Sequence, residues 1–215
     1  MTLTRLIVLI VLLAATPAAA APMALSLEQR GRVERGEVIV LDVLPPGDRA
    51  DAHQGGTVVA LMRTSAEAVW HVLLDFANHA GVYPRVVTTT VLQSDPSRTL
   101  VRYVVGVGPF SFGFHVNNYP DDSRRRLVWH LAEDRPNDLF RTSWGYWQLD
   151  PDPHGVVVTY AMAARTVLPA FLTRSAERDG LLATITAVRE RAEHAALAPG
   201  GSPSAAGAGA AAPAN

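Results

Sequence analysis

The sequence contains no cysteine and has no excess of charge of either sign. Without cysteine, the chain cannot form disulfides, thiolate metal sites or cysteine nucleophiles. Nineteen basic side chains stand against 20 acidic ones, for a formal net charge of −1. Because no basic surplus is present to bind a phosphate backbone, we expect no nucleic-acid partner. The hydrophobic fraction of 48% is that of a globular protein and is too high for a disordered one.

The motifs of several enzyme classes are also missing. There is no GxxxxGK[ST] loop for nucleoside triphosphates, no GxSxG turn for a nucleophilic serine, and no HExxH or paired-histidine spacing for zinc. Among the seven scattered histidines, His115 and His130 lie on predicted strands, where an imidazole could move protons inside a cavity. No set of nucleophile, base and orienting residue accompanies them. We therefore expect no metal ion, no cofactor and no catalytic residue.

The first residues have the order of parts of a secretory signal peptide. Arg5 supplies a positive charge, Leu6–Ala15 is an unbroken apolar run, and Ala18–Ala20 offers small residues for cleavage after Ala20. Pro17 interrupts the apolar run before the roughly 20 residues that a membrane-spanning helix needs. The sequence thus predicts a signal peptide over residues 1–20 and a periplasmic or secreted protein.

The other end of the chain is also predicted to lie outside the fold. Residues 196–215 carry no charged side chain and consist almost entirely of Ala, Gly, Pro and Ser. Such a segment buries too little apolar surface to offset its ordering entropy, so we expect a disordered tail. Between the two ends we expect an N-terminal segment over residues 21–54, with a short helix and an extra strand, and one domain over residues 55–195.

Hydrophobic periodicity and turn residues predict an α+β fold. Predicted helices cover Leu25–Arg35, Ala66–Phe76, Ala77–Tyr83 and a long stretch from Pro169 to about His194. Predicted strands are Glu37–Leu44, Thr57–Arg63, Val86–Gln93, Thr99–Val107, Phe110–Tyr119, Arg125–Ala132, Leu139–Leu149 and Val156–Arg165. Short polar turns between consecutive strands are typical of an antiparallel meander. The order predicts a helix-grip fold, a curved antiparallel sheet wrapped around a long C-terminal helix.

Several short motifs in a fixed order resemble one family. They are Ala66–Trp70, Leu74–Phe76, Tyr83–Val86, Gly145–Pro151 and Leu168–Leu172. In these the chain resembles the START-like/SRPBCC superfamily, in particular its polyketide cyclase and coenzyme Q-binding branch. The resemblance implies a deep cavity between the sheet and the C-terminal helix, filled by a lipid-like or aromatic ligand. Members include lipid carriers, cyclases and protein-binding modules, so the fold alone does not decide the function.

Alternation along the strands predicts which side chains line such a cavity. On Thr99–Val107 the odd-numbered residues should face inward because Arg102 needs water, and on Phe110–Tyr119 the aromatic set should face inward. On Leu139–Leu149 the period-two pattern does not distinguish the two faces. The predicted ligand contacts are Val101, Tyr103, Val105, Phe112, Phe114, Trp129, Trp144, Tyr160, Phe171 and Leu172.

The terminal helix adds two arginines to the predicted site. Its apolar stripe comprises Leu181, Ile185, Val188 and Ala192. Continued towards the N-terminus, the stripe reaches Arg178 and Arg174. Two interpretations stay open: either Asp179-Gly180 breaks the helix and turns the arginines outward, or they reach the cavity mouth and bind an anionic group of the ligand. The second interpretation makes both arginines ligand contacts.

We expect the protein to be an exported, monomeric carrier of a hydrophobic small molecule (a lipid, a quinone or a sterol- or hopanoid-like compound), with transient membrane contact. A carrier of this kind is a binding protein and not an enzyme. One alternative is a cyclase- or aromatase-like enzyme, in which His115, His130 or a tyrosine moves protons. A second alternative is a protein-interaction module, with an exposed apolar patch and a filled interior.

Overall fold

The computed structural model describes residues 25–46, 54–167 and 170–197, and for residues 170–177 it describes the backbone alone. The predicted signal peptide and residues 198–215 of the predicted tail therefore lie outside the described residues. The helices are α1 (Leu27–Glu34), α2 (Ala66–Leu74), the 3₁₀ helix η1 (Phe76–Gly81) and α3 (Ala170–Leu197). The strands are β1 (Ile39–Leu41), β2 (Gln54–Met62), β3 (Val86–Asp95), β4 (Arg98–Val107), β5 (Phe110–Asp121), β6 (Arg126–Leu131), β7 (Phe140–Asp152) and β8 (Gly155–Thr166).

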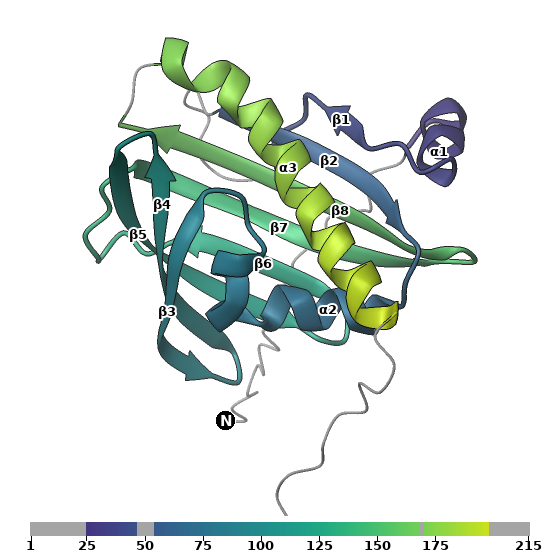
Figure 1. Ribbon diagram of the computed structural model, residues 1–215, viewed down its shortest axis with the longest axis horizontal. Helices are drawn as coiled ribbons and strands as arrows, with labels where there is room; N and C mark the ends of the chain where they lie inside the picture. The colour runs from purple at the N-terminus through teal and green to yellow at the C-terminus, as the bar shows by residue number, and fades with distance from the viewer. Residues whose placement is uncertain (1–24, 47–53, 168–169, 198–215) are drawn as a thin grey trace, which may run out of the picture.

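The eight strands form one antiparallel sheet in the order β1-β2-β8-β7-β6-β5-β4-β3. The sheet curves, and α2 and α3 lie on its concave side (Figure 1). This arrangement confirms the predicted α+β helix-grip fold. The strands β5 and β7 run on through Pro120 and Pro151, which we predicted to be turn residues, because both prolines still pair in register with neighbouring strands.

Helix α1 packs on the convex side of the sheet, next to the edge strand β1. Ser26 and Gln29 form a reciprocal capping box that starts α1. β1 pairs with β2, and Val33 and Ile39 pack with Val59 and Leu61, which point away from the concave face. The N-terminal segment thus covers part of the convex face and leaves the concave face to α2, η1 and α3.

Helix α3 is held to the sheet by the apolar stripe that the sequence predicts. The side chains of Leu181, Ile185, Val188 and Ala192 are all buried and belong to the main core, which is continuous with α2 and the inner side of β2. The helix is unbroken from Ala170 to Leu197, so the predicted interruption at Asp179-Gly180 is wrong. Among the described residues, no helix combines the length and the apolar character that crossing a membrane requires.

A polar clamp fixes α2 to the turn between β5 and β6. The buried indole of Trp70 donates a hydrogen bond from Nε1 to Asp122 Oδ1 at 2.6 Å. The guanidinium of Arg125 lies 5.7 Å from the centroid of the Trp70 ring and pairs with Glu67 at the start of α2. Because η1 follows α2 directly, this clamp also determines where η1 meets the sheet.

Truncating the stripe of α3 should weaken the whole fold. Ile185→Ala removes a side chain that is 0% exposed and should lower the free energy of unfolding by about 3 kcal/mol, as the lost transfer energy adds to a residual cavity. Urea unfolding measures this loss. The matched substitution at the exposed Glu190 of the same helix should change the value by less than about 0.5 kcal/mol. Equal effects at the two positions would contradict the described packing.

Candidate ligand cavity

A cavity of about 200 Å³ lies on the concave side of the sheet. Each of the strands β3 to β8 contributes side chains to its wall, and η1, the segment after η1 and Thr184 of α3 complete the lining. The main chain of α3 packs mostly against β2 and α2. The cavity therefore lies where the curved sheet is not covered directly by the long helix.

Five of the predicted contact residues lie in the lining of this cavity, namely Tyr103, Val105, Phe114, Trp129 and Tyr160. Their inward orientation follows from the alternation on β4, β5, β6 and β8, since paired residues on neighbouring strands share a face. The faces predicted for β4 and β5 are the faces that the structure shows.

Three other predicted residues lie elsewhere. Val101 has the predicted orientation, but it is fully buried in the core and does not line the cavity. Phe112 shares the face of Phe114 and is half-buried, outside the lining. Trp144, a predicted ligand contact on the strand whose two faces the pattern did not distinguish, does not line the cavity. β7 has an irregular register between Phe140 and Thr142, so Phe140 and the odd-numbered residues after it face the cavity.

The predictions for α3 have a mixed outcome. The side chains of Phe171, Leu172 and Arg174 lie outside the described residues. Arg178 is exposed and does not line the cavity, so its predicted place at the cavity mouth is wrong. The reason is that the first turns of α3 extend beyond the edge of the sheet (Figure 1). Among the α3 residues whose side chains are described, Thr184, about one and two-thirds turns after Arg178, reaches the lining.

The lining contains aromatic residues that the sequence analysis did not assign. Ring contacts with centroid separations of 4.1–6.4 Å form a continuous series. In order, the series comprises Tyr160, Trp147, Tyr83, His79, Tyr103, Phe114 and Phe140. Edge and stacked contacts of this kind stabilise ring positions beyond simple area burial. The cavity wall is therefore a largely fixed aromatic surface.

His79 is the one imidazole in this wall, and both of its nitrogens are engaged. The ring is 1% exposed. Nε2 lies 3.2 Å from the carbonyl oxygen of Leu73, which can only accept, so Nε2 carries the hydrogen. Nδ1 lies 2.9 Å from the hydroxyl of Tyr103 and therefore accepts a hydrogen bond from it. Burial lowers the pKa of His79 to about 4, so the imidazole is neutral at neutral pH.

The tyrosines of the wall are uncharged as well. Burial raises the pKa of the Tyr83, Tyr103 and Tyr160 hydroxyls well above the ordinary value. The neighbouring Tyr103 and Tyr160 hydroxyls raise the pKa of Tyr83 further. No Asp, Glu or Arg lies in the described lining. A charged ligand group would lose its hydration here without gaining a counter-ion, so this cavity suits an uncharged group.

His115 and His130, the two histidines considered as proton carriers, do not reach the cavity. They point to the convex side because their neighbours Phe114 and Trp129 point inward. The Nδ1 of His115 lies 2.8 Å from the carbonyl oxygen of Pro136. His130 is exposed and contacts Tyr119 edge-on. The alternative in which these two histidines move protons inside the cavity therefore does not fit their positions.

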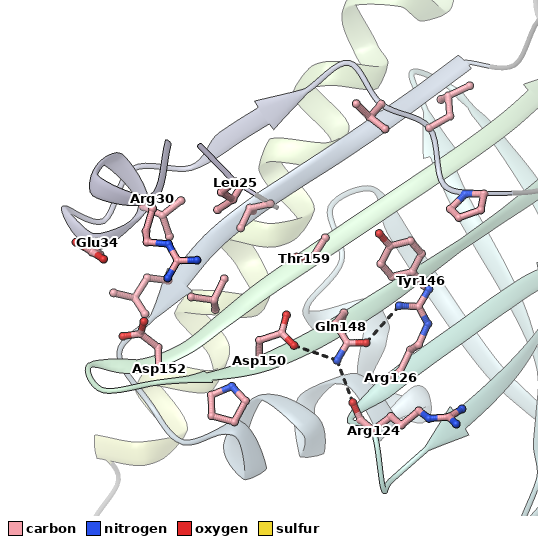
Figure 2. A pocket seen from close by; sticks show the side chains of 18 residues that line it. Leu25, Arg30, Glu34, Arg124, Arg126, Tyr146, Gln148, Asp150, Asp152 and Thr159 are labelled. Carbon is pink, nitrogen blue, oxygen red and sulfur yellow. Dashed lines mark hydrogen bonds between the residues drawn. The ribbon is translucent and has the colours of Figure 1, made fainter. Parts of the chain in front are cut away.

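A second hollow of about 920 Å³ lies on the convex side, between the N-terminal segment and β7 and β8 (Figure 2). Its polar side chains satisfy one another. Arg126 lies over the ring of Tyr146 at 3.9 Å and donates to Gln148, which in turn donates to Asp150. Charged side chains such as Arg126 and Asp150 line this larger hollow, whereas the described lining of the concave cavity is aromatic and contains no Asp, Glu or Arg. We therefore take the concave cavity as the candidate site.

The buried His79 should make the fold sensitive to acid. Its pKa falls from the ordinary 6.5 to about 4. Between these two pH values the unfolded chain binds a proton at His79 and the folded chain does not. The free energy of unfolding is therefore highest above pH 6.5 and decreases as the pH falls to about 4. The loss should approach about 3 kcal/mol.

Urea unfolding near pH 7 and near pH 4 tests this, with His79→Phe compared against the wild type. In His79→Phe the free energy of unfolding should no longer show the decrease between pH 6.5 and about 4 that is due to His79. In His194→Gln, a substitution at an exposed position of α3, the decrease should remain. An unchanged pH dependence in His79→Phe would contradict a buried neutral imidazole.

Solved structures of other proteins share this fold. An aromatase/cyclase, ZhuI, from Streptomyces sp. R1128 is 19% identical, with a TM-score of 0.58, and the match covers 70% of this chain and 99% of that one. A STAR-related lipid transfer protein from Xanthomonas axonopodis is 18% identical, with a TM-score of 0.58, and the match covers 72% and 92% of the two chains. A START superfamily protein from Mycobacterium smegmatis is 16% identical, with a TM-score of 0.56 and coverage of 67% and 99%.

At these identities the solved structures establish the fold and leave the activity open. A comparison with curated protein sequences finds no match. The sequence profile of one family, described as polyketide cyclase/dehydrase and lipid transport, matches residues 62–189, which is more than half of the chain and includes most of the cavity wall. The chain therefore belongs to this family of the START/SRPBCC superfamily, whose fold binds hydrophobic ligands.

Proposed function

We propose that the protein is an exported carrier that holds an uncharged, ring-containing hydrophobic molecule in the concave cavity and releases it unchanged. The observation that carries this proposal is an aromatic cavity of about 200 Å³ without a charged side chain in its described lining. The order of residues 1–20 supports export. We further propose that the carrier works as a monomer and contacts a membrane transiently to load its ligand.

The cavity volume limits the part of the ligand that is buried. An engineered apolar cavity of about 150 Å³ in another protein binds benzene. A cavity of about 200 Å³ therefore suits one ring with short substituents. A quinone or sterol-like ligand would place one ring inside and keep the rest of its apolar surface outside. The carboxylate of a fatty acid or the phosphate of a phospholipid is a poor guest, because no described lining group compensates for its charge.

The energy of the hydrophobic effect sets the affinity expected for a single ring. Burial of about 150 Å² of apolar surface contributes roughly 4 kcal/mol. This corresponds to a dissociation constant of about 1 mM. A natural ligand with a further apolar chain would bind more tightly, and no covalent chemistry is needed to hold it.

An enzyme of the aromatase/cyclase type is the second candidate, and the contact between His79 and Tyr103 favours it. An imidazole nitrogen 2.9 Å from a hydroxyl has the geometry of a base and a proton relay. The lowered pKa of about 4 makes His79 a weak base at neutral pH, however. We therefore favour the carrier. Mass spectrometry of an extracted ligand before and after incubation separates the two: a carrier returns the original mass, and an enzyme returns an altered one.

Filling the cavity should abolish binding without unfolding the protein. Val105 lines the cavity and its neighbour Val104 lies on the opposite face of β4, and both are half-buried. Val105→Phe should weaken the binding of para-xylene at least about tenfold, because the added ring takes up ligand volume. Val104→Phe should leave it unchanged. Calorimetry or ligand-detected nuclear magnetic resonance measures the affinity. Equal binding by the two variants would contradict the proposed site.

A further inference from the structure

We infer that Tyr103 selects ligands whose ring carries a hydroxyl group, a phenol or an enol, over ligands whose ring carries an ether or a carbonyl. This inference rests on the proposed function, in which a ring enters the cavity. It concerns one hydrogen atom, that of the Tyr103 hydroxyl, and the direction in which it points.

The direction of that hydrogen follows from a chain of three groups. The Leu73 carbonyl can only accept, so it engages the Nε2 hydrogen of His79. A neutral imidazole carries one hydrogen, so Nδ1 presents a lone pair. The Tyr103 hydroxyl, 2.9 Å away, must then donate to Nδ1. Since a hydroxyl has a single hydrogen, the Tyr103 oxygen presents only lone pairs to the cavity.

Two other polar side chains of the lining also direct their hydrogens into the protein. The Ser143 hydroxyl donates to the Ala163 carbonyl at 3.4 Å. The Asn118 amide donates to the carbonyls of Thr99 and Val116 at 3.2 and 3.4 Å. These groups add no hydrogen that an acceptor on the ligand could use.

Tyr160 is different, because its hydroxyl donates to the thioether sulfur of Met162 at 3.4 Å. Sulfur of this kind is a weak acceptor, so this hydrogen can turn towards a ligand. A ligand hydroxyl can donate to Tyr103 and still accept from Tyr160. An ether or carbonyl oxygen can only accept, and it leaves the Tyr103 lone pairs without a partner. A buried polar group without a partner is costly, so the hydroxyl is preferred.

Three ring compounds of nearly equal size test this inference: para-cresol brings a hydroxyl, para-tolualdehyde brings only an acceptor, and para-xylene brings neither. In Tyr103→Phe the affinity for para-cresol should fall about tenfold, the value of one hydrogen bond at the upper end of its usual range. The ratio of para-cresol to para-xylene affinity should therefore fall about tenfold. Tyr119→Phe removes a tyrosine hydroxyl from the exposed convex side and should change neither affinity.

A second variant tests the direction of the hydrogen. In His79→Phe the Tyr103 hydroxyl loses its acceptor and is free to donate to the ligand. The affinity for para-tolualdehyde should then rise about tenfold relative to that for para-xylene. Thermal melting of each variant identifies any that fails to fold.

A measurement on the wild type needs no variant: nitrogen-15 resonances of the His79 ring at neutral pH should show Nε2 protonated and Nδ1 unprotonated. A protonated Nδ1 would overturn the inference, because the Tyr103 hydrogen would then be free for the ligand.

An unchanged ratio of para-cresol to para-xylene affinity in Tyr103→Phe would also overturn the inference. If para-xylene binds and only the selectivity is missing, the proposed function survives. If none of the three compounds binds the wild type, both proposals are wrong.

Discussion

One helix cannot cover a curved sheet of eight strands, and the candidate site depends on this constraint. The buried stripe of α3 packs mainly against β2 and α2. The inner faces of β4 to β7 must therefore be covered by their own side chains, which explains why large aromatic residues gather there. Gly145 illustrates how tightly they fit: a Cβ at this position would lie 2.6 Å from the indole of Trp129 and 2.3 Å from the Ala161 carbonyl oxygen. Trp129, which lines the cavity, can lie this close to β7 only because residue 145 has no side chain.

The absence of charge in the described lining gives this space its chemical character. His79 could have brought a positive charge into the wall, but its burial and its two hydrogen bonds keep it neutral. The tyrosines are likewise held in their uncharged form by burial. Charged side chains gather instead on the convex side, where Arg126 and Asp150 stand close to Gln148 (Figure 2). The two faces of one sheet thus differ sharply in polarity, as expected when one face binds an apolar guest and the other meets water.

The fold and five residues of the cavity lining could be predicted from the sequence, because both follow from periodic patterns. Alternation placed Tyr103 and Phe114 on the inner face, and helical spacing placed Ile185 in the core. Trp144 was misplaced because a single irregularity in β7 reverses the alternation, and no residue near Phe140 marks it. Arg178 was misplaced because periodicity says which residues share a face but not where the sheet beneath them ends. His79 was missed for a third reason: its role depends on Leu73 and Tyr103, and only the packing of η1 against β3 and β4 brings Tyr103 to it.

The central claim is that a dry, aromatic hollow persists on the concave side of the sheet, beside α3, in the folded protein. A crystal structure determined under xenon pressure tests it most directly, since xenon occupies apolar cavities and avoids hydrated ones. The account predicts a xenon site enclosed by Tyr103, Trp147 and Met162. Ordered water molecules at that position, or wall side chains that have closed the space, would contradict it.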